Sequence, residues 1–405
     1  MSVIPDTARR GRAPVPAAAP SRTVRATLLA SASLTIMAAA VIAPSLPQMS
    51  RVFAGVPAGD VLVRLCLTIT SLAIGLTATV AGAVTDRIGR KPVLVGSLVL
   101  YAVAGVGGYV AGDLGVLLAT RAVLGLAVGG IMSAVSAMIT DLYDGPRRAW
   151  FLGLQSAAAS LGGVVFLPVA GLLAGVSWHA PFLLYVAAVL ILPFAAVGVR
   201  ETRVPDPVAS YRPANGSRAR GQRGVIALVF ALAVIGTLVF FMAPTQLPFL
   251  LQGFGVSPPV VGVAVAGSTA SSAVAALGFA RVRNRLGRGS ITVLSLGALG
   301  VGWVIVGLAG SVVQVLAGVL VGGVGVGLII PNLNLWLSEL VDAARRGRVL
   351  GGLVSAIFVG QFLSPLVLAP LISWVGLGAA FVVSGVVLPG VTAVIVALLR
   401  RLDAG

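Results

Sequence analysis

The sequence predicts an all-α membrane protein with twelve transmembrane helices in two pseudo-symmetric six-helix bundles. Three observations predict this fold class. The composition is strongly apolar, the charged residues divide the chain into twelve apolar spans, and motifs of the first half recur in the second.

Composition excludes a soluble globular fold. Of the 405 residues, 58% are hydrophobic and only 10% are charged. The core of a soluble domain stops growing at about 250–300 residues, so such a fold could not keep this much apolar surface from water. The 52 glycines stand within apolar runs, where small residues let membrane helices approach closely. The single cysteine, Cys66, excludes an intrachain disulfide.

Charge-free intervals give the span count, because a helix needs about 20 apolar residues to cross a bilayer. Four intervals of single-span length are 26–50, 65–85, 92–112 and 114–140, the last interrupted only by Arg121. Four intervals of 50 to 57 residues follow at 149–199, 224–280, 289–338 and 349–399. Each longer interval holds two spans and a turn, so the total is twelve.

The basic residues predict the orientation in the membrane. Of the 28 lysines and arginines, 25 fall in the termini and in alternate loops, and only Arg51, Arg64 and Arg121 fall elsewhere. Clusters of this kind mark the cytoplasmic side, so we expect a multi-pass protein of the plasma (inner) membrane with both termini in the cytoplasm. The net charge of +17 therefore reflects topology and contact with the lipid bilayer, and we expect no nucleic-acid partner.

These patterns divide the chain into five parts. Residues 1–25 are expected to be a disordered basic cytoplasmic tail, and residues 400–405 a second cytoplasmic tail. Residues 26–199 and 224–399 are the two six-helix bundles, joined by a cytoplasmic loop at 200–223.

An internal repeat relates the two bundles. The segment 86–90 (DRIGR) matches 284–288 (NRLGR) at an offset of 198 residues, and the same offset maps Gly125 and Gly129 onto two further glycines. Proline-containing segments at 43–47 and 243–248 are expected to close spans 1 and 7. A same-direction repeat of six spans is typical of transporters whose halves rock around a central site.

The segment 82–91 (GAVTDRIGRK) resembles the cytoplasmic signature between spans 2 and 3 of the major facilitator superfamily, and the resemblance extends over residues 26–399. The expected gate residues of this signature are Gly82, Asp86, Arg87, Gly89, Arg90 and Lys91, with Asp141 as a second acidic partner. Gly82 would remove a side chain where helices cross, and Gly89 would permit a tight turn. The charges would latch the two halves on one side only. In the second half Asn284 replaces the acid, which predicts a weaker latch there.

Other candidate residues lie within the spans. Arg121 stands about 8 Å inside the outer end of span 4, where a buried charge indicates substrate binding or proton coupling, although a shallow arginine can also reach the interface. Residues 121–125 resemble the span-4 motif of the same family, in which an arginine is linked to substrate or proton coupling. Gly163, Pro168 and Gly171 partly match the antiporter motif of span 5, and an ordinary kinked helix remains the alternative.

Polar or aromatic groups at membrane depth are candidates to line a cavity or to bond one helix to another. They are Asn332, Asn334, Trp336 and Gln361. Asp60 and Arg64, four residues apart, are expected to form an interfacial ion pair.

The resemblance implies a secondary transporter related to the drug:proton antiporters, which exports small hydrophobic compounds by alternating access. The alternatives are an importer or uniporter of a neutral small metabolite, and a non-transporting receptor. With one histidine and one cysteine the chain is not expected to be an enzyme or to hold a metal or cofactor. We expect a monomer, a small-molecule substrate and protons as the coupling ion, although no acidic residue stands at mid-span.

Tags placed at the N-terminus, near Arg218 and at the C-terminus are each expected to report the cytoplasm, because the basic clusters map to that side. Reporter fusions in intact cells measure this. A periplasmic signal from any of the three positions would contradict the twelve-span arrangement.

Overall fold

The computed structural model of the protein describes residues 20–201 and 218–404. Over these residues the chain is helical without a strand, and twelve helical spans are long and apolar enough to cross a membrane. The predicted fold class is therefore confirmed. The expected disorder of the N-terminal tail and most of the expected loop at 200–223 concern residues 1–19 and 202–217, which lie outside the described residues.

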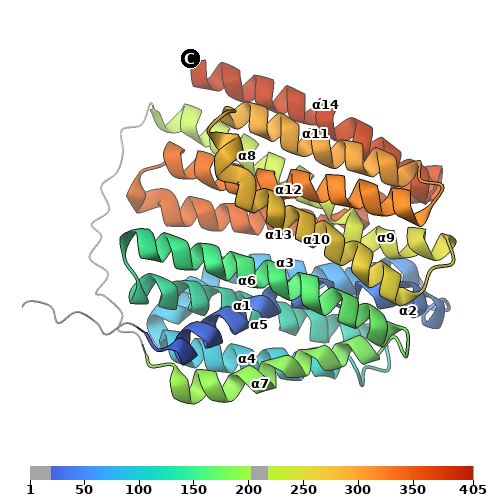
Figure 1. The fold of residues 1–405 in the computed structure, drawn as a ribbon, viewed down its shortest axis with the longest axis horizontal. Helices are drawn as coiled ribbons and strands as arrows, with labels where there is room; N and C mark the ends of the chain where they lie inside the picture. The colour runs from blue at the N-terminus through green and yellow to red at the C-terminus, as the bar shows by residue number, and fades with distance from the viewer. Residues whose placement is uncertain (1–19, 202–217, 405) are drawn as a thin grey trace, which may run out of the picture.

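The first half occupies the lower part of Figure 1 and the second half the upper part. The helices of the first half are α1 (Arg22–Ala40), η1 (Ala43–Ser45), α2 (Leu46–Val52), α3 (Gly59–Ile88), α4 (Arg90–Gly107), α5 (Leu114–Leu142), α6 (Gly145–Ala174), η2 (Ala180–Val186), α7 (Ala187–Pro193) and η3 (Phe194–Gly198). Those of the second half are α8 (Arg218–Phe240), α9 (Met242–Gly253), α10 (Pro258–Arg283), α11 (Arg288–Gly307), α12 (Val312–Leu340), α13 (Ala343–Val375) and α14 (Leu377–Ala404). The start of α1 and the end of α14 lie at one end of the bundle, here called the basic end because the arginine clusters lie there.

Spans 1 and 7 do not close where the sequence was expected to close them. Span 1 runs from Arg22 to Val52, and the segment 43–47 is a break inside it, formed by the short 3-10 helix η1. Segment 243–248 likewise lies within α9, just after the break at Phe241. Pro44 and Pro47 lie in the first turns of η1 and α2, where a missing N–H costs no helical hydrogen bond, so each proline starts a new segment rather than ending the span.

The internal repeat is visible in equivalent caps. Asp113 accepts a hydrogen bond from Val116 N at 2.9 Å and begins α5. Ser311, 198 residues later, accepts from Gln314 N at 3.4 Å and begins α12. A side-chain oxygen at this position satisfies one of the N–H groups that a helix start leaves without a partner.

The two halves also pack through equivalent glycines. Gly125 and Gly129 bring α5 against α3, since a Cβ at Gly129 would lie 2.7 Å from Thr77 Cβ. Gly323 and Gly327, at the same offset, bring α12 against α10 in the same way. Without a hydrophobic effect between helices in lipid, close backbone approach provides the packing energy.

The halves meet along two seams, α6 with α10 and α3 with α13. On α6, a Cβ at Gly163 would lie 2.8 Å from Ile36 Cγ2 and 3.1 Å from Thr269 Cγ2, so this glycine contacts both α1 and α10. At the end opposite the basic end, Gly171 packs on Gly262, and a Cβ there would lie 3.2 Å from Gly262 Cα. Pro168 lies inside α6 between these contacts.

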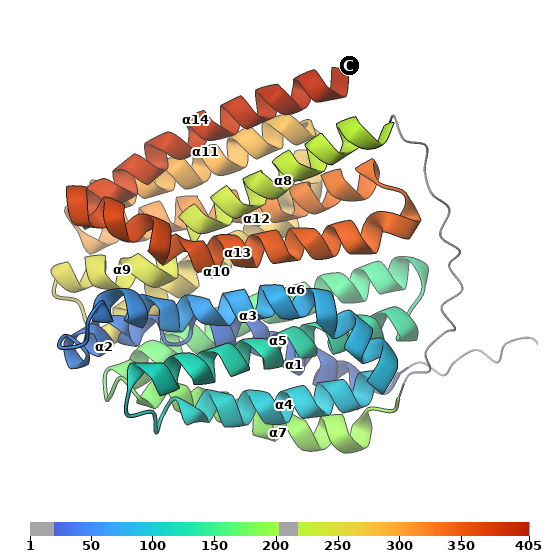
Figure 2. The ribbon, with the colours of Figure 1, turned by 180° about the vertical axis from the view of Figure 1, so that it is seen from behind.

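Toward the basic end the halves part. Figure 1 shows α6 and α10 diverging in this direction, and Figure 2 shows the same of α3 and α13. A Cβ added at Gly82, Gly278 or Gly351 would meet no atom within 4 Å. The expected helix crossing at Gly82 is therefore not made in this conformation, because the seam has opened before reaching it.

Two glycines of α10 provide a matched test of the seam. Gly262→Ala is expected to destabilise the protein by about 1–3 kcal/mol, because the added methyl overpacks the contact with α6. Gly278→Ala on the same helix meets no neighbour and should be neutral or stabilising by up to about 1 kcal/mol. Thermal unfolding of the purified variants measures both, and equal destabilisation would contradict the described seam.

Candidate functional site

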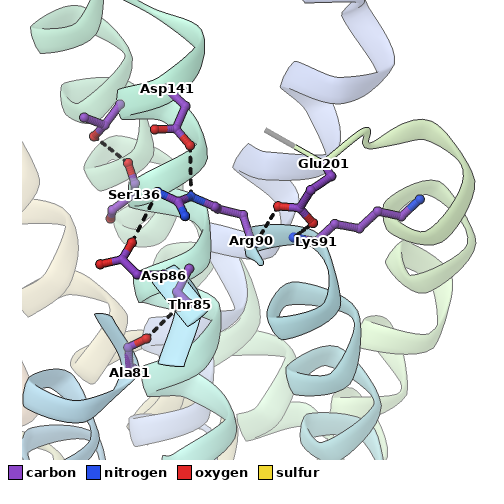
Figure 3. A network of polar contacts seen from close by, with 9 residues as sticks. Ala81, Thr85, Asp86, Arg90, Lys91, Ser136, Asp141 and Glu201 are labelled. Atoms are coloured by element: carbon purple, nitrogen blue, oxygen red, sulfur yellow. Dashed lines mark hydrogen bonds and ion pairs between the residues drawn. The ribbon is translucent and has the colours of Figure 1, made fainter. Parts of the chain in front are cut away.

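Arg90, the first residue of α4, stands at the centre of a polar network at the basic end (Figure 3). Its Nη2 lies 3.2 Å from Asp86 Oδ1, and its Nε donates to Asp141 Oδ2 at 3.0 Å. The arginine side chain is 6% exposed, whereas those of Asp86 and Asp141 are 63% and 14% exposed. One buried guanidinium thus joins the ends of α3 and α5, and the structure brings these three predicted gate residues together.

Glu201, which follows the last helix of the first half in the sequence, completes the network at the basic end. Its carboxylate accepts hydrogen bonds from the backbone N–H groups of Arg90 at 2.7 Å and Lys91 at 3.1 Å. The first N–H groups of a helix lack partners within the helix, and a carboxylate there also interacts favourably with the helix dipole. Glu201 therefore ties the chain that follows span 6 to the start of α4.

Gly89 is required at the turn for two reasons. Its φ of +106° is a backbone conformation that L side chains rarely adopt. In addition, a Cβ at this position would lie 2.9 Å from Glu201 Oε2. The glycine thus allows both the turn from α3 into α4 and the approach of the capping carboxylate.

Glu201 is a member of the network that the sequence did not predict. Glu201 lies 111 positions after Arg90 and 110 after Lys91 in the sequence, so no local sequence pattern predicts these hydrogen bonds. The available signal was its position, since Glu201 is the first acidic residue after span 6.

Two predicted gate side chains lie outside this network. Arg87 is exposed on the last turn of α3 and makes no ion pair among the described residues. Lys91 contributes its backbone N–H, while its side chain points away from Arg90 (Figure 3).

The second half contains a simpler version of the network. Arg288 Nη1 lies 3.4 Å from Glu339 Oε2, and both side chains are more than one third exposed. Glu339 follows Asp141 by the repeat offset of 198, which is the signal that could have identified it from the sequence. With Asn284 in place of the other acid, the described second half has one half-exposed pair where the first has two around a buried arginine.

Three of the four polar or aromatic candidates at membrane depth bond within the second half. Asn332 is fully buried and donates to Arg288 O at 3.1 Å and Thr292 Oγ1 at 3.0 Å, which ties α12 to α11. Asn334 donates to Ile330 O in its own helix at 3.0 Å. The ring of Trp336 lies 5.8 Å from the Arg288 guanidinium.

Gln361 differs from these three because it crosses between the halves. Its Oε1 accepts a hydrogen bond from Ser71 at 2.8 Å, and six residues earlier on α13 Ser355 donates to Gly75 O at 3.0 Å. These bonds join α13 to α3 in the middle of the seam.

Arg121 is wholly enclosed within the first half. Its side chain is 0% exposed, and Nη2 donates to Ala104 O at 3.0 Å and Gly105 O at 2.9 Å, both on α4. The rings of Phe182 and Tyr185 on η2 lie 4.8 and 4.9 Å from the guanidinium carbon. Carbonyl oxygens and aromatic faces are neutral partners that stabilise a buried cation.

This enclosure excludes the alternative that Arg121 reaches the membrane interface. Gly108 makes room for it, since a Cβ there would lie 3.0 Å from Arg121 Nη2, and Gly105 makes room for the neighbouring ring of Tyr185. Among the described residues no acid pairs with Arg121, and its Nε and Nη1 have no hydrogen-bond partner. The arginine thus links α5 to α4 and η2.

His179 lies between spans 5 and 6, at the end opposite the basic end. Its ring stacks on Trp178 with centroids 3.5 Å apart. Burial lowers the pKa of His179 below its ordinary value near 6.5, because removal from water disfavours the charged ring.

The sequence of the chain is similar to the sequences of known proteins. A sequence model described as the Major Facilitator Superfamily matches residues 28–252 and 228–405. The tetracycline resistance protein, class C, of Escherichia coli is 30% identical over 311 residues, which cover 72% of this chain and 75% of that protein. The multidrug resistance protein MdtL of Escherichia coli O81 (strain ED1a) is 26% identical over 232 residues, which cover 56% of this chain and 59% of that protein.

Solved structures share the fold at lower identity. A mutant of the peptide transporter POT in complex with sulfate matches with a TM-score of 0.80 at 14% identity, over 95% of this chain and 97% of that chain. The human organic anion transporter MFSD10 (TETRAN) matches with a TM-score of 0.68 at 20% identity, over 93% of this chain and 99% of that chain. At these identities the likeness concerns the fold alone.

Glu201→Ala is expected to lower the free energy of unfolding by about 1–2 kcal/mol, because two N–H groups at the start of α4 lose their cap. Glu339→Ala removes a half-exposed ion pair at the same end and should cost less than about 1 kcal/mol. Chemical or thermal unfolding of the two purified variants provides the comparison. A smaller effect for Glu201→Ala than for Glu339→Ala would contradict the capping role.

Proposed function

The chain belongs to the Major Facilitator Superfamily, and we propose that it exports small apolar, drug-like compounds across the plasma (inner) membrane in exchange for protons, by alternating access. The observation that carries this proposal is the similarity to a tetracycline resistance protein over about three quarters of both chains. That similarity supports both the direction of transport and the class of substrate.

The distribution of charge supports an apolar substrate. Arg121 is the one charge inside a described span away from the helix ends, and it is enclosed by α4 and η2. A charged substrate would need a compensating charge at membrane depth, where lipid provides none. A neutral or lipophilic compound does not.

We assign the basic end to the cytoplasm, since arginine and lysine are retained there. In this orientation the described conformation is open to the cytoplasm, because the halves part at the basic end and meet at the other. Export also requires the reverse arrangement, in which the basic ends close.

The network around Arg90 is the proposed latch of that reverse arrangement. Asp86, Arg90, Asp141 and Glu201 fix the relative positions of α3, α4 and α5 at the basic end. A rigid edge on the first half gives the second half a fixed surface to close against. Packed interfaces of this kind have discrete arrangements rather than a continuum, as a two-state gate requires.

Proton coupling must use groups near the helix ends or a proton of the substrate. Within the described residues the acidic residues lie in first or last turns, at caps or just after a span: Asp60, Asp86, Asp113, Asp141, Asp144, Glu201, Glu339, Asp342 and Asp403. Burial lowers the pKa of His179, which disfavours the protonated ring, and the residue lies in the loop between spans 5 and 6, so we do not propose it as the proton carrier. We propose that Arg121 contributes by positioning α5, which carries Asp141 at its other end.

Inverted membrane vesicles with an imposed proton gradient test the function. With a panel of lipophilic compounds that includes tetracycline, we expect accumulation that a protonophore abolishes, because export in cells becomes uptake in inverted vesicles. Arg121→Ala should abolish this uptake and Arg121→Lys should restore it in part, since lysine keeps the charge but lacks the planar guanidinium that lies against the rings of Phe182 and Tyr185.

Exchange without a gradient, measured in the same vesicles, shows which step Arg121 serves. A positioning role predicts that Arg121→Ala loses exchange as well as gradient-driven uptake. Uptake by the unmodified protein that does not depend on the proton gradient would contradict proton coupling. Full activity of Arg121→Ala would contradict any role for the arginine.

A further inference from the structure

Two of the basic residues that stand outside the cytoplasmic clusters reach across to the second half. The guanidinium carbon of Arg64, on α3, lies 4.3 Å from the ring centroid of Phe249 on α9. Arg51, at the end of α2, faces Gln252, which like Phe249 lies on α9. With its amide oxygen toward the guanidinium, Gln252 accepts from Arg51 Nε at 3.2 Å and from Nη2. α2 and α9 lie side by side at the end opposite the basic end in both views (Figures 1 and 2).

The expected ion pair between Asp60 and Arg64 is not among the described ion pairs. Instead, Arg64 Nη1 donates to the backbone oxygen of Asp60 at 3.2 Å, and the rest of the guanidinium extends over Phe249. The helix backbone thus anchors the arginine while its planar face meets the other half. Stacking on a ring is a preferred arrangement for a weakly hydrated guanidinium.

We propose that Arg51, Arg64, Phe249 and Gln252 form an outer clasp that holds the two halves together in the cytoplasm-open conformation. The proposal rests on the alternating access proposed above. Phe249 and Gln252 are three residues apart and therefore neighbours on the surface of α9, so one helix face meets both arginines. The clasp lies at the same end of the molecule as the contact of Gly171 with Gly262, so it reinforces a closure that close packing already favours.

The chemistry of the clasp suits a gate that must open. Both partners of the arginines are neutral, a ring and an amide, so opening the clasp separates no opposite charges. A cation over a ring contributes a modest stabilisation at a partly exposed site. The clasp therefore biases the equilibrium without locking it.

Unpaired polar groups in the same seam oppose the clasp. Gln246 lies three residues before Phe249 on α9, is fully buried, and neither of its amide atoms has a hydrogen-bond partner among the described residues. Ser45 Oγ is likewise buried without a partner in η1, which packs against α9. Buried polar groups without partners are costly, and opening of the seam would let water reach them. The clasp and these groups thus act in opposite directions on one equilibrium.

A cysteine at Ser45 reports the opening of this seam. In a Cys66→Ala background, which removes the chain's one cysteine, Ser45→Cys is reachable by a membrane-impermeant maleimide from outside only when the halves part there. Labelling in intact cells should be slow in this parent. Arg64→Gln and Phe249→Leu should each raise the rate roughly three- to tenfold, and the double variant no further than either single one, because both remove the same contact.

Three further variants separate the clasp from general destabilisation. Arg64→Lys retains the cation and should restore most of the slow labelling. Phe254→Leu, at the end of the same helix, packs on the core of the second half and should leave the rate unchanged. Gln246→Leu removes an unpaired polar group and should slow the labelling below that of the parent.

Two results would overturn the proposal in distinguishable ways. If Ser45→Cys is labelled in response to an exported compound but neither Arg64→Gln nor Phe249→Leu changes the rate, the clasp is wrong and alternating access stands. If Ser45→Cys is labelled only after denaturation, under every condition in the native membrane, the halves do not part at this end and alternating access itself is wrong.

Discussion

A charge at membrane depth must receive its partners from the protein, because lipid offers none, and this constraint organises the whole molecule. Charged residues of the described chain therefore gather at the helix ends, and the interior consists mainly of apolar and small residues. Arg121 is the exception, and two carbonyls and two aromatic rings replace the water it has lost. The charges at the two ends are then free to act between helices, as Arg90 does at one end and Arg64 at the other.

Close packing at glycines makes each half rigid, so a contact made by a charged group at one end acts on the whole half. Within each half, the paired glycines of α5 and α12 press one helix on the next, and between the halves Gly171 meets Gly262. The seam of α6 and α10 that begins at this contact has opened by Gly153 and Gly278 at the other end of the two helices. A molecule with two stiff halves and a seam closed at one end can exchange which end is closed by a rotation that leaves each half intact.

The sequence predicted what depends on local pattern. The span count follows from where charges interrupt apolar runs, and the grouping of Asp86, Arg90 and Asp141 follows from a motif with a regular charge pattern. It did not predict Glu201 as the cap of α4, or the reach of Arg51 and Arg64 to α9, because these contacts join segments far apart in the chain. The prolines of segments 43–47 and 243–248 predict span ends, but both segments lie inside their spans, since proline starts a helix as readily as it stops one.

Distances between the halves, measured at both ends of the same molecule, decide whether these two ends open in turn. Spin labels at Gly153 and Gly278 report the basic end, and labels at the exposed Val176 and Leu308 report the other, each pair in a Cys66→Ala background. Addition of an exported compound or a proton gradient should shorten the first distance while the second lengthens. Distances that change in the same direction, or that stay fixed while transport proceeds, would contradict the account.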